Sequence, residues 1–515
     1  MNEQKHNLKG GTNMRKNYEN INDLNEIMND ANDLIVDRIK HLHQLEERGI
    51  NPYPYKFKEV THSNYIINNF DSIDEEQVLT VAGRIMLMRN MGNATFLNIR
   101  DQEGDIQVYL SKSILGAEKY EEIKFFDIGD IIGFEGNVFR TKTGEITIKA
   151  KELSLLTKAI RPLPEKHHGI QDADLRQRHR SLDMIMNNEV RERFINRARG
   201  MAAIREYMNT LNFVEAETPI LDTKYGGGEA KPFVTNVNAM DCEVYMNVSP
   251  ELYLKRLMVG GIERVYTMGR SFRNEGIDRT HYPEFTLFEC YMAYADYNDM
   301  MVLMENLYEY VFVKVNGTTK IVYDGVEIDF KAPWKRATMC ELVKLDTELD
   351  VLNLSKDDMI KAIASKGLLI DCKDFESMSK GDIIMELFDA YSASKLQQPT
   401  FVIDFPAESS PLCKLHRENG DLIERFEPYA FGVELGNAYS ELNDPLRQRI
   451  LLHEQASKLR AGLETASPMD EEFALAIDVG MPPAGGLGIG IDRMMMFLTN
   501  SYSIKDVIAF PLMKR

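Results

Sequence analysis

The sequence predicts an α+β protein in which a small β-barrel precedes a larger domain with an antiparallel sheet flanked by helices. Short runs of alternating apolar and polar residues fill positions 78–157, separated by turn signals such as "QEGD" and "KTGE". Several strands of this length at this spacing are typical of a closed barrel. Beyond residue 188, a helical stripe and several strand-like segments indicate a second domain.

The size and charge of the chain restrict its possible functions. Its 515 residues exceed what one hydrophobic core usually organises, so two or three domains are expected. It carries 61 basic and 80 acidic residues, a net charge of −19, which argues against indiscriminate binding of nucleic acid. This charge does not exclude a nucleic-acid partner held by a local basic patch.

The sequence has no feature of a secreted or membrane protein. It contains no apolar run of the roughly 18–20 residues that a membrane helix needs, and no signal segment at its start. A cytoplasmic protein in a reducing compartment, with no membrane partner, is therefore expected. The cysteines are too far apart for zinc-ligand spacing or a disulfide framework: Cys242, Cys290, Cys340, Cys372 and Cys413.

Two segments precede the predicted barrel. Residues 1–32 are rich in Asn and poor in large apolar groups, which is typical of a disordered tail. Residues 33–77 are expected to form a helical segment, because apolar residues from Leu34 to Leu45 recur on one helical face. "GINPYPYKF" then ends that helix, since its prolines remove backbone donors.

The larger domain is expected at residues 188–515, after a linker at 158–187. Its first helix is followed by the strand "FVEAETPIL", with Pro219 near the end, where a missing N–H costs least. A helix-rich insertion at about 317–397 separates two halves of the domain, and strands resume at "FVIDFP".

The first candidate site lies in "GRSFRNEGIDRTHYPEFTLFE", residues 269–289, which combines a strand, a turn and an antiparallel return strand. Such a hairpin would present Arg273 to an anion and place Glu289 and Tyr291 on one face. An exposed cross-strand ladder of ion pairs explains the same charges equally well.

A second cluster lies in "RFEPYAFGVELGNAYSEL", where Asn437, Tyr439 and Glu441 alternate along one strand. Glu427 and Glu434 stand seven residues apart, and carboxylates on neighbouring strands can hold Mg²⁺ together with substrate phosphates. A solvated acidic face is the alternative.

The third cluster, "GGLGIGIDR", lacks dinucleotide-binding G-x-G-x-x-G spacing, because Arg493 stands where the last Gly should be. That Arg could stack on a base or clamp a phosphate, and the helix dipole disfavours a chance Arg there. In "VSPELYLKRLMVGG", capping explains Glu251, with Ser249 as N-cap. The loop "KYGGGEAKPF" is explained by glycine flexibility with or without a ligand.

Together, the three clusters resemble the three signature motifs of class II aminoacyl-tRNA synthetases. In detail they are similar to the lysyl-tRNA synthetase family, of subclass IIb, through "FRNEG", "THYPEFT", "ECYMAYADY", "NAYSELNDP", "GIGIDR", "SPELYLKRL" and the linker "IRPLPEK". The resemblance covers about residues 33–515. It implies an anticodon-binding OB-fold at residues 78–157, followed by a class II catalytic domain.

The resemblance implies that ATP and L-lysine form lysyl-adenylate, and that the lysyl group then passes to the 3′ end of tRNA(Lys). Arg273 and Arg493 would be catalytic, and Phe285 and Arg493 would cover opposite faces of adenine. Glu427 and Glu434 would bind Mg²⁺. The residues expected to bind ATP are Arg273, Asn274, Glu275, His281, Phe285, Glu434, Gly490 and Arg493.

The resemblance also implies a lysine pocket, with Glu289 and Glu441 on the ε-ammonium and Glu251 and Gly227 on the α-amino group. Buried acids without a cation are costly, so an analogue that lacks the amine is rejected. The residues expected to bind lysine are Gly227, Glu251, Arg273, Glu289, Tyr291, Asn437, Tyr439 and Glu441.

Two interfaces follow from the same resemblance. Arg89, Phe96 and Gln107 match the residues that recognise the central anticodon uridine. Without that match, Phe96 would be assigned to the barrel core. The helix before "FVEAETPIL" matches the family's dimer element, so a homodimer is expected, with Pro219 near the two-fold axis.

Three positions depart from the family pattern. Glu229 stands where small residues are usual, Thr267 where an acid is common, and Tyr282 where Asn is usual. Glu229 and Tyr282 fall near the amino-acid and adenine subsites, so affinities could differ. None of the three removes a predicted catalytic group.

Three alternative functions remain on the sequence alone. An aspartate or asparagine enzyme of this subclass needs a basic residue or an amide reader in its pocket, which Glu289 and Glu441 do not supply. A lysyl-transferring paralogue that modifies a translation factor typically lacks the barrel. A catalytically inactive binding subunit usually lacks the two arginines, Arg273 and Arg493, and both are present.

Overall fold

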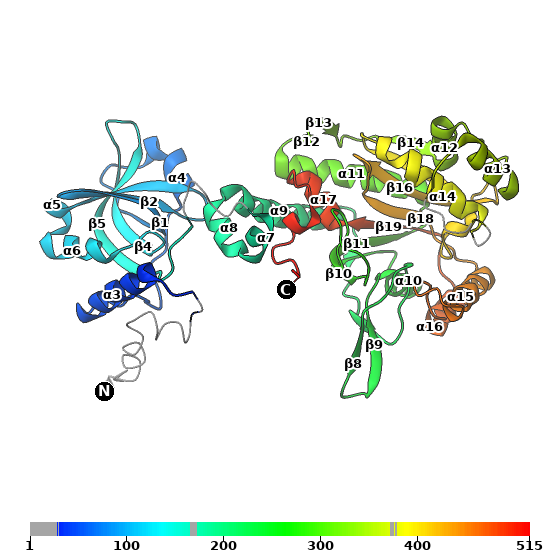
Figure 1. The fold of residues 1–515 in the computed structure, drawn as a ribbon, viewed down its shortest axis with the longest axis horizontal. Helices are drawn as coiled ribbons and strands as arrows, with labels where there is room; N and C mark the ends of the chain where they lie inside the picture. The colour runs from blue at the N-terminus through cyan, green and yellow to red at the C-terminus, as the bar shows by residue number, and fades with distance from the viewer. Residues whose placement is uncertain (1–27, 29, 165–171, 371–374, 376–377, 515) are drawn as a thin grey trace. The chain divides into compact units, whose positions relative to one another are not determined.

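The computed structural model describes residues 28, 30–164, 172–370, 375 and 378–514 (Figure 1). Most of the predicted tail, residues 1–32, lies outside the described residues. The chain divides into two compact units, Met1–Gly169 and Ile170–Arg515, and the division falls within the segment 158–187 predicted as a linker.

The first unit begins with helix α3 (Asp33–Glu47), whose N-cap Asn32 accepts a hydrogen bond from the N–H of Ile35. Its buried face carries Ile35, Ile39, Leu42 and Leu45. Leu34, which was expected on this face, is 60% exposed, because it lies one residue outside the repeat that Ile35 starts. The short helices α4 (Ser63–Asn68) and η1 (Phe70–Ser72) follow.

Five strands then form a closed barrel in the order β1-β2-β3-β5-β4. Strands β3 and β5 pair in parallel and the other neighbours are antiparallel. Alternate side chains point inward, so that Leu97, Ile99, Val108 and Phe134 are buried in the barrel core. The elements are β1 (Leu79–Met91), β2 (Ala94–Arg100), β3 (Asp105–Ser111), α5 (Lys112–Leu115), α6 (Ala117–Glu121), η2 (Glu122–Phe125), β4 (Ile131–Arg140) and β5 (Ile146–Thr157).

The described residues of the second unit form a nine-stranded, mostly antiparallel sheet in the order β14-β15-β16-β18-β19-β11-β10-β6, with β17 paired to β16. Two edge pairs, β10 with β6 and β14 with β15, are parallel. The strands are β6 (Val214–Glu215), β10 (Arg264–Phe272), β11 (Glu284–Ala293), β14 (Lys335–Thr338), β15 (Thr400–Pro406), β16 (Leu422–Ala430), β17 (Val433–Glu434), β18 (Gly436–Ser440) and β19 (Ala484–Gly490).

Helices cover both faces of this sheet. One core joins residues of α9, α11 and α17, and a second core joins residues of α10, α12, α14 and α16. Along β11 the side chains alternate, so that Phe288 and Cys290 enter the first core, whereas Tyr291 enters the second. The helices are α7 (Ala173–Arg178), α8 (Arg180–Met186), α9 (Asn188–Thr210), α10 (Glu251–Val259), α11 (Tyr297–Asn316), α12 (Met339–Thr347), α13 (Lys356–Lys366), α14 (Lys380–Tyr391), η3 (Ala393–Lys395), η4 (Ala407–Ser409), α15 (Pro445–Arg460), α16 (Glu471–Val479), α17 (Ile491–Leu498) and α18 (Ile504–Val507).

Two predicted segments differ in detail. "FVEAETPIL" is not one strand, because β6 ends at Glu215 and Pro219 lies in the loop before β7 (Leu221–Asp222). The predicted insertion, 317–397, contains helices α12 to α14, but its strand β14 belongs to the main sheet. Smaller sheets are formed by β12 (Lys320–Tyr323) with β13 (Val326–Asp329), and by β7, β8 (Val234–Val237) and β9 (Cys242–Met246).

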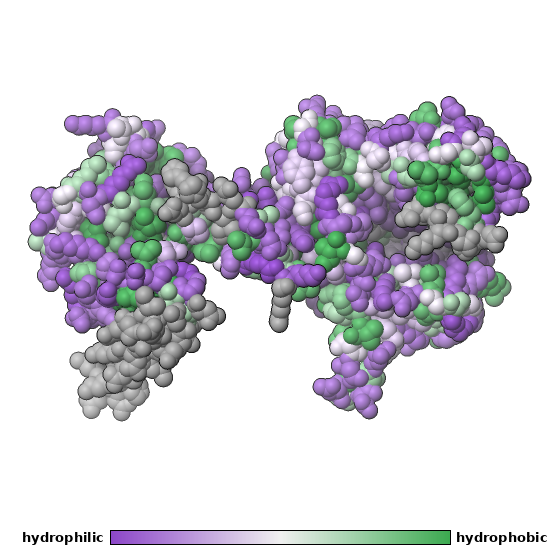
Figure 2. All heavy atoms as spheres, in the orientation of Figure 1, coloured by the Kyte–Doolittle hydropathy of each residue, from purple (hydrophilic) through white to green (hydrophobic). Residues whose placement is uncertain are grey.

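The β8–β9 hairpin projects from the body of the second unit (Figure 1). The visible surface is mostly hydrophilic, with apolar side chains gathered in limited patches (Figure 2). Within the described parts of the chain, no helix combines the length and apolar character that a membrane crossing requires.

Candidate active site

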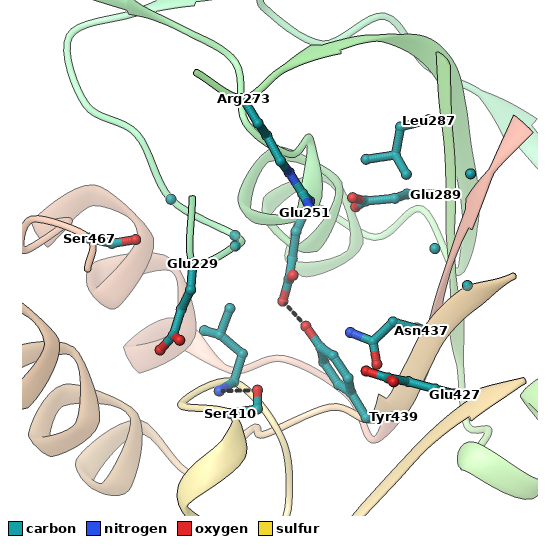
Figure 3. A pocket seen from close by; sticks show the side chains of 18 of the residues that line it. Glu229, Glu251, Arg273, Leu287, Glu289, Ser410, Glu427, Asn437, Tyr439 and Ser467 are labelled. Carbon is teal, nitrogen blue, oxygen red and sulfur yellow. Dashed lines mark hydrogen bonds between the residues drawn. The ribbon is translucent and has the colours of Figure 1, made fainter. Parts of the chain in front are cut away.

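A cavity of about 440 Å³ opens on the sheet of the second unit (Figure 3). Its wall combines the β10–β11 hairpin, strands β16 to β19, the first turn of α10 and the glycine-rich loop at 225–229. The predicted ATP and lysine residues that line it are Gly227, Glu251, Arg273, Glu275, His281, Phe285, Glu289, Tyr291, Glu434, Asn437, Tyr439, Gly490 and Arg493.

Arg273 lies one residue beyond β10, at the start of the hairpin loop. Its N–H donates to the carbonyl of Pro283 at 2.9 Å, which extends the β10–β11 ladder past the strand end. Its guanidinium carbon lies 5.2 Å from the centre of the Phe285 ring. The residue expected to bind phosphate therefore lies against the aromatic ring expected to stack on adenine.

Arg493, in the first turn of α17, contacts two other predicted ATP residues. One guanidinium nitrogen donates to the backbone carbonyl and the carboxylate of Glu434, at 2.9 and 3.1 Å, and another lies 2.9 Å from His281 Nε2. Residues from α17, β17 and the hairpin loop thus meet on one side of the cavity. This contact set makes the Arg of "GIDR" part of the site and not a chance feature of a helix start.

Asn274 does not line the cavity. Its backbone N–H donates to the carbonyl of Lys231 at 2.7 Å, so it joins the hairpin loop to the glycine-rich loop. The role of Asn274 at the ATP subsite stays a prediction.

Asp492, which the sequence analysis did not single out, connects α17 with β11 and α9. Its carboxylate accepts the N–H of Thr286 on β11 at 2.6 Å and pairs with Arg197 on α9 at 2.7 Å. Arg197 also donates to the hydroxyl of Thr286 at 3.0 Å. The only sequence signal for this role is the position of Asp492 directly before Arg493.

Glu427 on β16 and Glu434 on β17 both line the cavity. The two oxygens of Glu427 accept from Arg425 at 2.6 Å and from the Tyr429 hydroxyl at 2.8 Å. Burial raises the pKa of Glu427 to about 7; Arg425 opposes this shift and the Glu434 charge adds to it. Among the residues that the structure describes, no three His, Cys, Asp or Glu side chains form a metal cluster. The pair therefore fits a hard cation that brings further oxygen ligands with it, as Mg²⁺ does with phosphates.

Arg425 is a second residue that the sequence analysis missed. It lines the cavity, and besides Glu427 it contacts Asn437, whose side-chain oxygen accepts its Nε–H at 2.9 Å. It therefore fixes one predicted metal residue and one predicted lysine residue at once. An Arg followed two residues later by Glu in a strand is too common a pattern to reveal this from sequence.

Glu289 lines the same cavity, with 6% of its surface exposed. Its two carboxylate oxygens accept from the hydroxyls of Ser249 at 2.7 Å and Tyr291 at 3.1 Å. Burial, followed by the charge of Glu251, raises its pKa to about 8. Glu289 is thus not a member of a surface ion-pair ladder. The hairpin does carry one exposed cross-strand contact of that kind, Arg270 with Glu284 at 3.7 Å.

Glu251 is a pocket residue and not a capping residue. The helix α10 starts at Glu251 with Pro250 as N-cap, one residue later than predicted, and Ser249 accepts the Glu251 N–H at 3.2 Å. The Glu251 carboxylate is buried, and one of its oxygens accepts from Lys255 at 2.6 Å and from the Tyr439 hydroxyl at 2.6 Å (Figure 3).

Glu441 lies behind the cavity wall and not in it. It is fully buried, and its carboxylate lies 2.5 Å from the ammonium of Lys255. A lysine of the chain itself thus lies beside Glu441, and a contact between Glu441 and the ε-ammonium stays a prediction. Lys255 was not predicted, since Glu and Lys four residues apart on a helix usually form a surface pair.

Gly227 occupies a position that only glycine fits. Its φ is +77°, and a Cβ there would lie 2.9 Å from both the Glu251 Cβ and the Ser249 hydroxyl. The glycine-rich loop can therefore approach the start of α10 closely, and this approach is what gives the loop a specific role beyond flexibility.

The three departures from the family pattern all lie at or beside the cavity. Glu229 lines it and accepts from the Gln455 side chain at 3.0 Å, which joins the glycine-rich loop to α15. Tyr282 also lines it, and its hydroxyl bonds both the N–H and the carbonyl of Leu512. Thr267 stands directly opposite Glu289 in the hairpin.

The barrel of the first unit carries the predicted anticodon residues on one outer face. Arg89 stands opposite Phe96, and Gln107 stands opposite Asn98, two residues from Phe96 and on its side of the sheet. Phe96 is half-buried while Thr95 and Leu97 point inward, so the assignment of Phe96 to the barrel core is wrong.

The same face contains aromatic residues that were not predicted. The ring of Tyr109 lies 5.0 Å from that of Phe96, and the ring of Phe139 lies 6.2 Å from that of Tyr109. Aromatic rings from β2, β3 and β4 on this face provide a stacking surface for unpaired bases.

Comparison with known proteins assigns both units. Residues 79–156 match the family described as "OB-fold nucleic acid binding domain", and residues 172–514 match "tRNA synthetases class II (D, K and N)". The lysine–tRNA ligase of Clostridium novyi (strain NT) is 49% identical over 94% of this chain and 95% of its own length. The lysine–tRNA ligase of Thermoanaerobacter pseudethanolicus (strain ATCC 33223 / 39E) is 48% identical over 94% of this chain and 97% of its own.

The chain belongs to the lysine–tRNA ligase family. A third member, from Clostridium kluyveri, is 47% identical over 97% of this chain and 99% of its own length. The class II description covers enzymes for three amino acids, D, K and N. Among these three, the relatives named above are lysine–tRNA ligases. The resemblance seen in the sequence, and the expected OB-fold followed by a class II domain, are thereby confirmed.

Proposed function

We propose that this chain activates L-lysine with ATP and transfers the lysyl group to tRNA(Lys). The observation that carries the proposal is a cavity lined both by Arg273, Arg493 and Phe285 and by the buried carboxylates Glu251 and Glu289. The first group suits an adenine nucleotide, and the second suits a ligand with ammonium groups.

In the first step, a carboxylate oxygen of lysine bonds to the α-phosphorus of ATP, and the bond from that phosphorus to pyrophosphate breaks. Arg273 is placed to hold the substrate carboxylate and the α-phosphate, so it stabilises the charge that develops between them. Phe285 and Arg493 hold the adenine ring. Positioning and electrostatics account for this chemistry without a general acid or base.

The lysine end of the cavity selects by charge. An ammonium group has three donors, and a site built to pair with it rejects an uncharged analogue because the carboxylates are left unpaired. Glu289 is assigned to direct contact with the ε-ammonium, with Glu441 adding its charge from behind the cavity wall, and Glu251 with Gly227 is assigned to the α-amino group. Tyr291, Asn437 and Tyr439 surround the stem between them.

Mg²⁺ is the metal that these residues suit. Glu427 and Glu434 would hold it, and when bound it neutralises charge on the phosphates of ATP. Arg425 and Tyr429 orient Glu427 for this purpose through their hydrogen bonds.

In the second step, a terminal ribose hydroxyl of the tRNA attacks the lysyl carbonyl carbon, and AMP leaves. The barrel face with Arg89, Phe96 and Gln107 would read the anticodon by stacking and hydrogen bonds. We place this activity in the cytoplasm, which agrees with free thiols at Cys242, Cys290, Cys340 and Cys413.

A homodimer is part of the proposal. Val214, Ile220 and Leu221 flank Pro219 and are 47–50% exposed, which leaves an apolar strip at one edge of the second unit. A second copy would cover that strip. Sedimentation equilibrium is expected to give twice the chain mass for the wild type and the monomer mass for I220E; a monomeric wild type would contradict the proposal.

Aminoacylation tests the whole proposal. Purified protein with ATP, Mg²⁺ and labelled lysine is expected to charge a tRNA(Lys) transcript, and a transcript with a changed central anticodon base should be charged more slowly. Charging of neither transcript by folded protein would overturn it.

A further inference from the structure

Lys255 is a fully buried cation beneath the lysine end of the cavity. Its ammonium lies 2.6 Å from Glu251 and 2.5 Å from Glu441. The rings of Tyr291, Tyr439 and Phe473 lie around it, with centres 5.9, 5.5 and 6.0 Å away. Carboxylates and aromatic faces together form a built site for a cation, and a side chain of the chain itself fills it.

The position of Lys255 follows from helix α10. Residues four apart on a helix share a face, so Glu251 and Lys255 point together into the second core, where Leu254 and Met258 are also buried. A buried ammonium is costly unless it is paired on more than one side, and Glu441 on the strand side completes the pairing. The ion pairs of Lys255 thus join helix α10 to the end of strand β18 beneath the cavity.

Lys255 also determines which carboxylate oxygens remain for a ligand. One oxygen of Glu251 accepts from both Lys255 and the Tyr439 hydroxyl, and its other oxygen has no hydrogen bond to either group. Glu289 accepts hydrogen bonds from the hydroxyls of Ser249 and Tyr291, and among the described residues no basic side chain forms an ion pair with it.

The charges around the buried carboxylates can be counted for their ionised forms. When ionised, Glu251, Glu289 and Glu441 carry three negative charges, and Lys255 carries one positive charge, which leaves two. L-lysine brings two ammonium groups, while its carboxylate is assigned to Arg273. The ligand therefore balances the pocket only because Lys255 has already cancelled one carboxylate.

We propose that Lys255 is a specificity-determining residue, a resident cation that sets the pocket to accept a ligand with two ammonium groups. The inference rests on the proposed function, since the count has meaning only for lysine as substrate. In this role Lys255 holds the carboxylates of Glu251 and Glu441 in place and does not contact the reacting atoms.

The first test compares K255M with K314M in lysine-dependent ATP–pyrophosphate exchange. Methionine keeps the length and apolar stem and removes the charge. Lys314 forms an exposed pair with Glu206 and serves as the matched control. K255M is expected to raise the KM for lysine at least about tenfold, while the KM for ATP stays within about twofold. An unchanged KM for lysine, or an equal rise in both constants, would overturn the proposal.

The second test restores the cation from solution. In K255A, propylammonium replaces the missing carbons and nitrogen, and 1-propanol is its uncharged counterpart. Rescue of lysine-dependent exchange by propylammonium but not by 1-propanol is expected. Rescue by both would assign Lys255 a space-filling role, and rescue by neither would likewise contradict a role of its charge.

A crystal structure of the wild type with lysine keeps the proposal testable if the variants do not fold. The Lys255 ammonium is expected to stay on Glu251 and Glu441 beside the bound ligand; its departure from both would overturn the proposal. Wild-type exchange with lysine separates this result from the proposed function. Absence of that exchange would refute the function itself, whereas normal wild-type exchange with unaffected K255M would refute only the role of Lys255.

Discussion

Glu289 shows how a single residue prepares the pocket for a cation. Its oxygens are held by the hydroxyls of Ser249 and Tyr291, which fix the carboxylate without cancelling its charge. A buried carboxylate in this condition is destabilised until a cation arrives, and so it discriminates against any ligand that brings none.

The pH dependence of stability follows from this arrangement. Burial raises the pKa of Glu289 to about 8. A carboxyl with a folded pKa above its unfolded value stabilises the fold below the unfolded value, and this contribution is lost as pH rises through about 8. The melting temperature of the ligand-free protein should therefore fall between about pH 4.5 and about pH 8 and level off at higher pH.

Bound lysine should oppose that fall, because its ammonium pairs with the ionised carboxylates. The thermal shift caused by saturating lysine is expected to grow between about pH 6.5 and about pH 8.5, where each pKa unit is equivalent to about 1.4 kcal/mol. Scanning fluorimetry of wild type and E289Q measures this. A shift that stays flat in the wild type, or grows equally in E289Q, would refute the assignment.

A substitution at Arg273 tests the proposed binding of the ATP α-phosphate. R273A should reduce exchange by at least about 10²–10³-fold, since it removes the group that stabilises charge on the α-phosphate. R270A is the matched control, because Arg270 lies on the same hairpin and pairs with Glu284 outside the cavity. Near-normal exchange by folded R273A would show that another group does this work.

Among the elements, strand β19 shows why the glycines of "GGLGIGIDR" are needed. A Cβ on Gly486 would lie 1.9 Å from a Glu441 oxygen and 2.6 Å from the Tyr291 ring, and a Cβ on Gly436 of the neighbouring strand would lie 2.4 Å from the Gly488 carbonyl. These glycines allow Glu441 and Tyr291 to pack directly against β19, and allow β18 and β19 to lie close together. Their function is therefore close packing at the amino-acid end and not the cradling of a phosphate.

A substitution on the outer face of the barrel tests the proposed recognition of the anticodon. F96A should reduce tRNA charging by about tenfold or more, because stacking of one base contributes about 1–3 kcal/mol. The rate of lysine-dependent ATP–pyrophosphate exchange should stay unchanged in F96A, since that reaction uses no tRNA. Tyr55, which is 97% exposed in the same unit, provides the control variant Y55A. Equal loss of charging and exchange in F96A would indicate damage to the fold.

Sequence predicted the elements whose pattern is local. The hairpin, the barrel strands and the Gly-rich strand have alternation and turn signals that can be read along the chain. Lys255, Arg425 and Asp492 could not be predicted in this way, because their partners are distant in sequence or look like surface pairs. Burial, which only the folded chain reveals, turns these common pairs into parts of the site.

At the scale of the whole molecule, the proposed function divides the reaction between the two units. Amino-acid activation is assigned to the cavity of the second unit, and anticodon recognition is assigned to the barrel of the first. Each unit has its own core, so a change on the outer face of the barrel leaves the cavity residues in place. Exchange and charging therefore measure different parts of one chain.

The most direct test of the account is ATP–pyrophosphate exchange, measured on the wild type with each of the twenty amino acids in turn. Because the carboxylates at the end of the cavity require ammonium groups, exchange is predicted with lysine and with no other amino acid. Exchange with aspartate or asparagine, or with none in a folded sample, would contradict the assignment of the pocket.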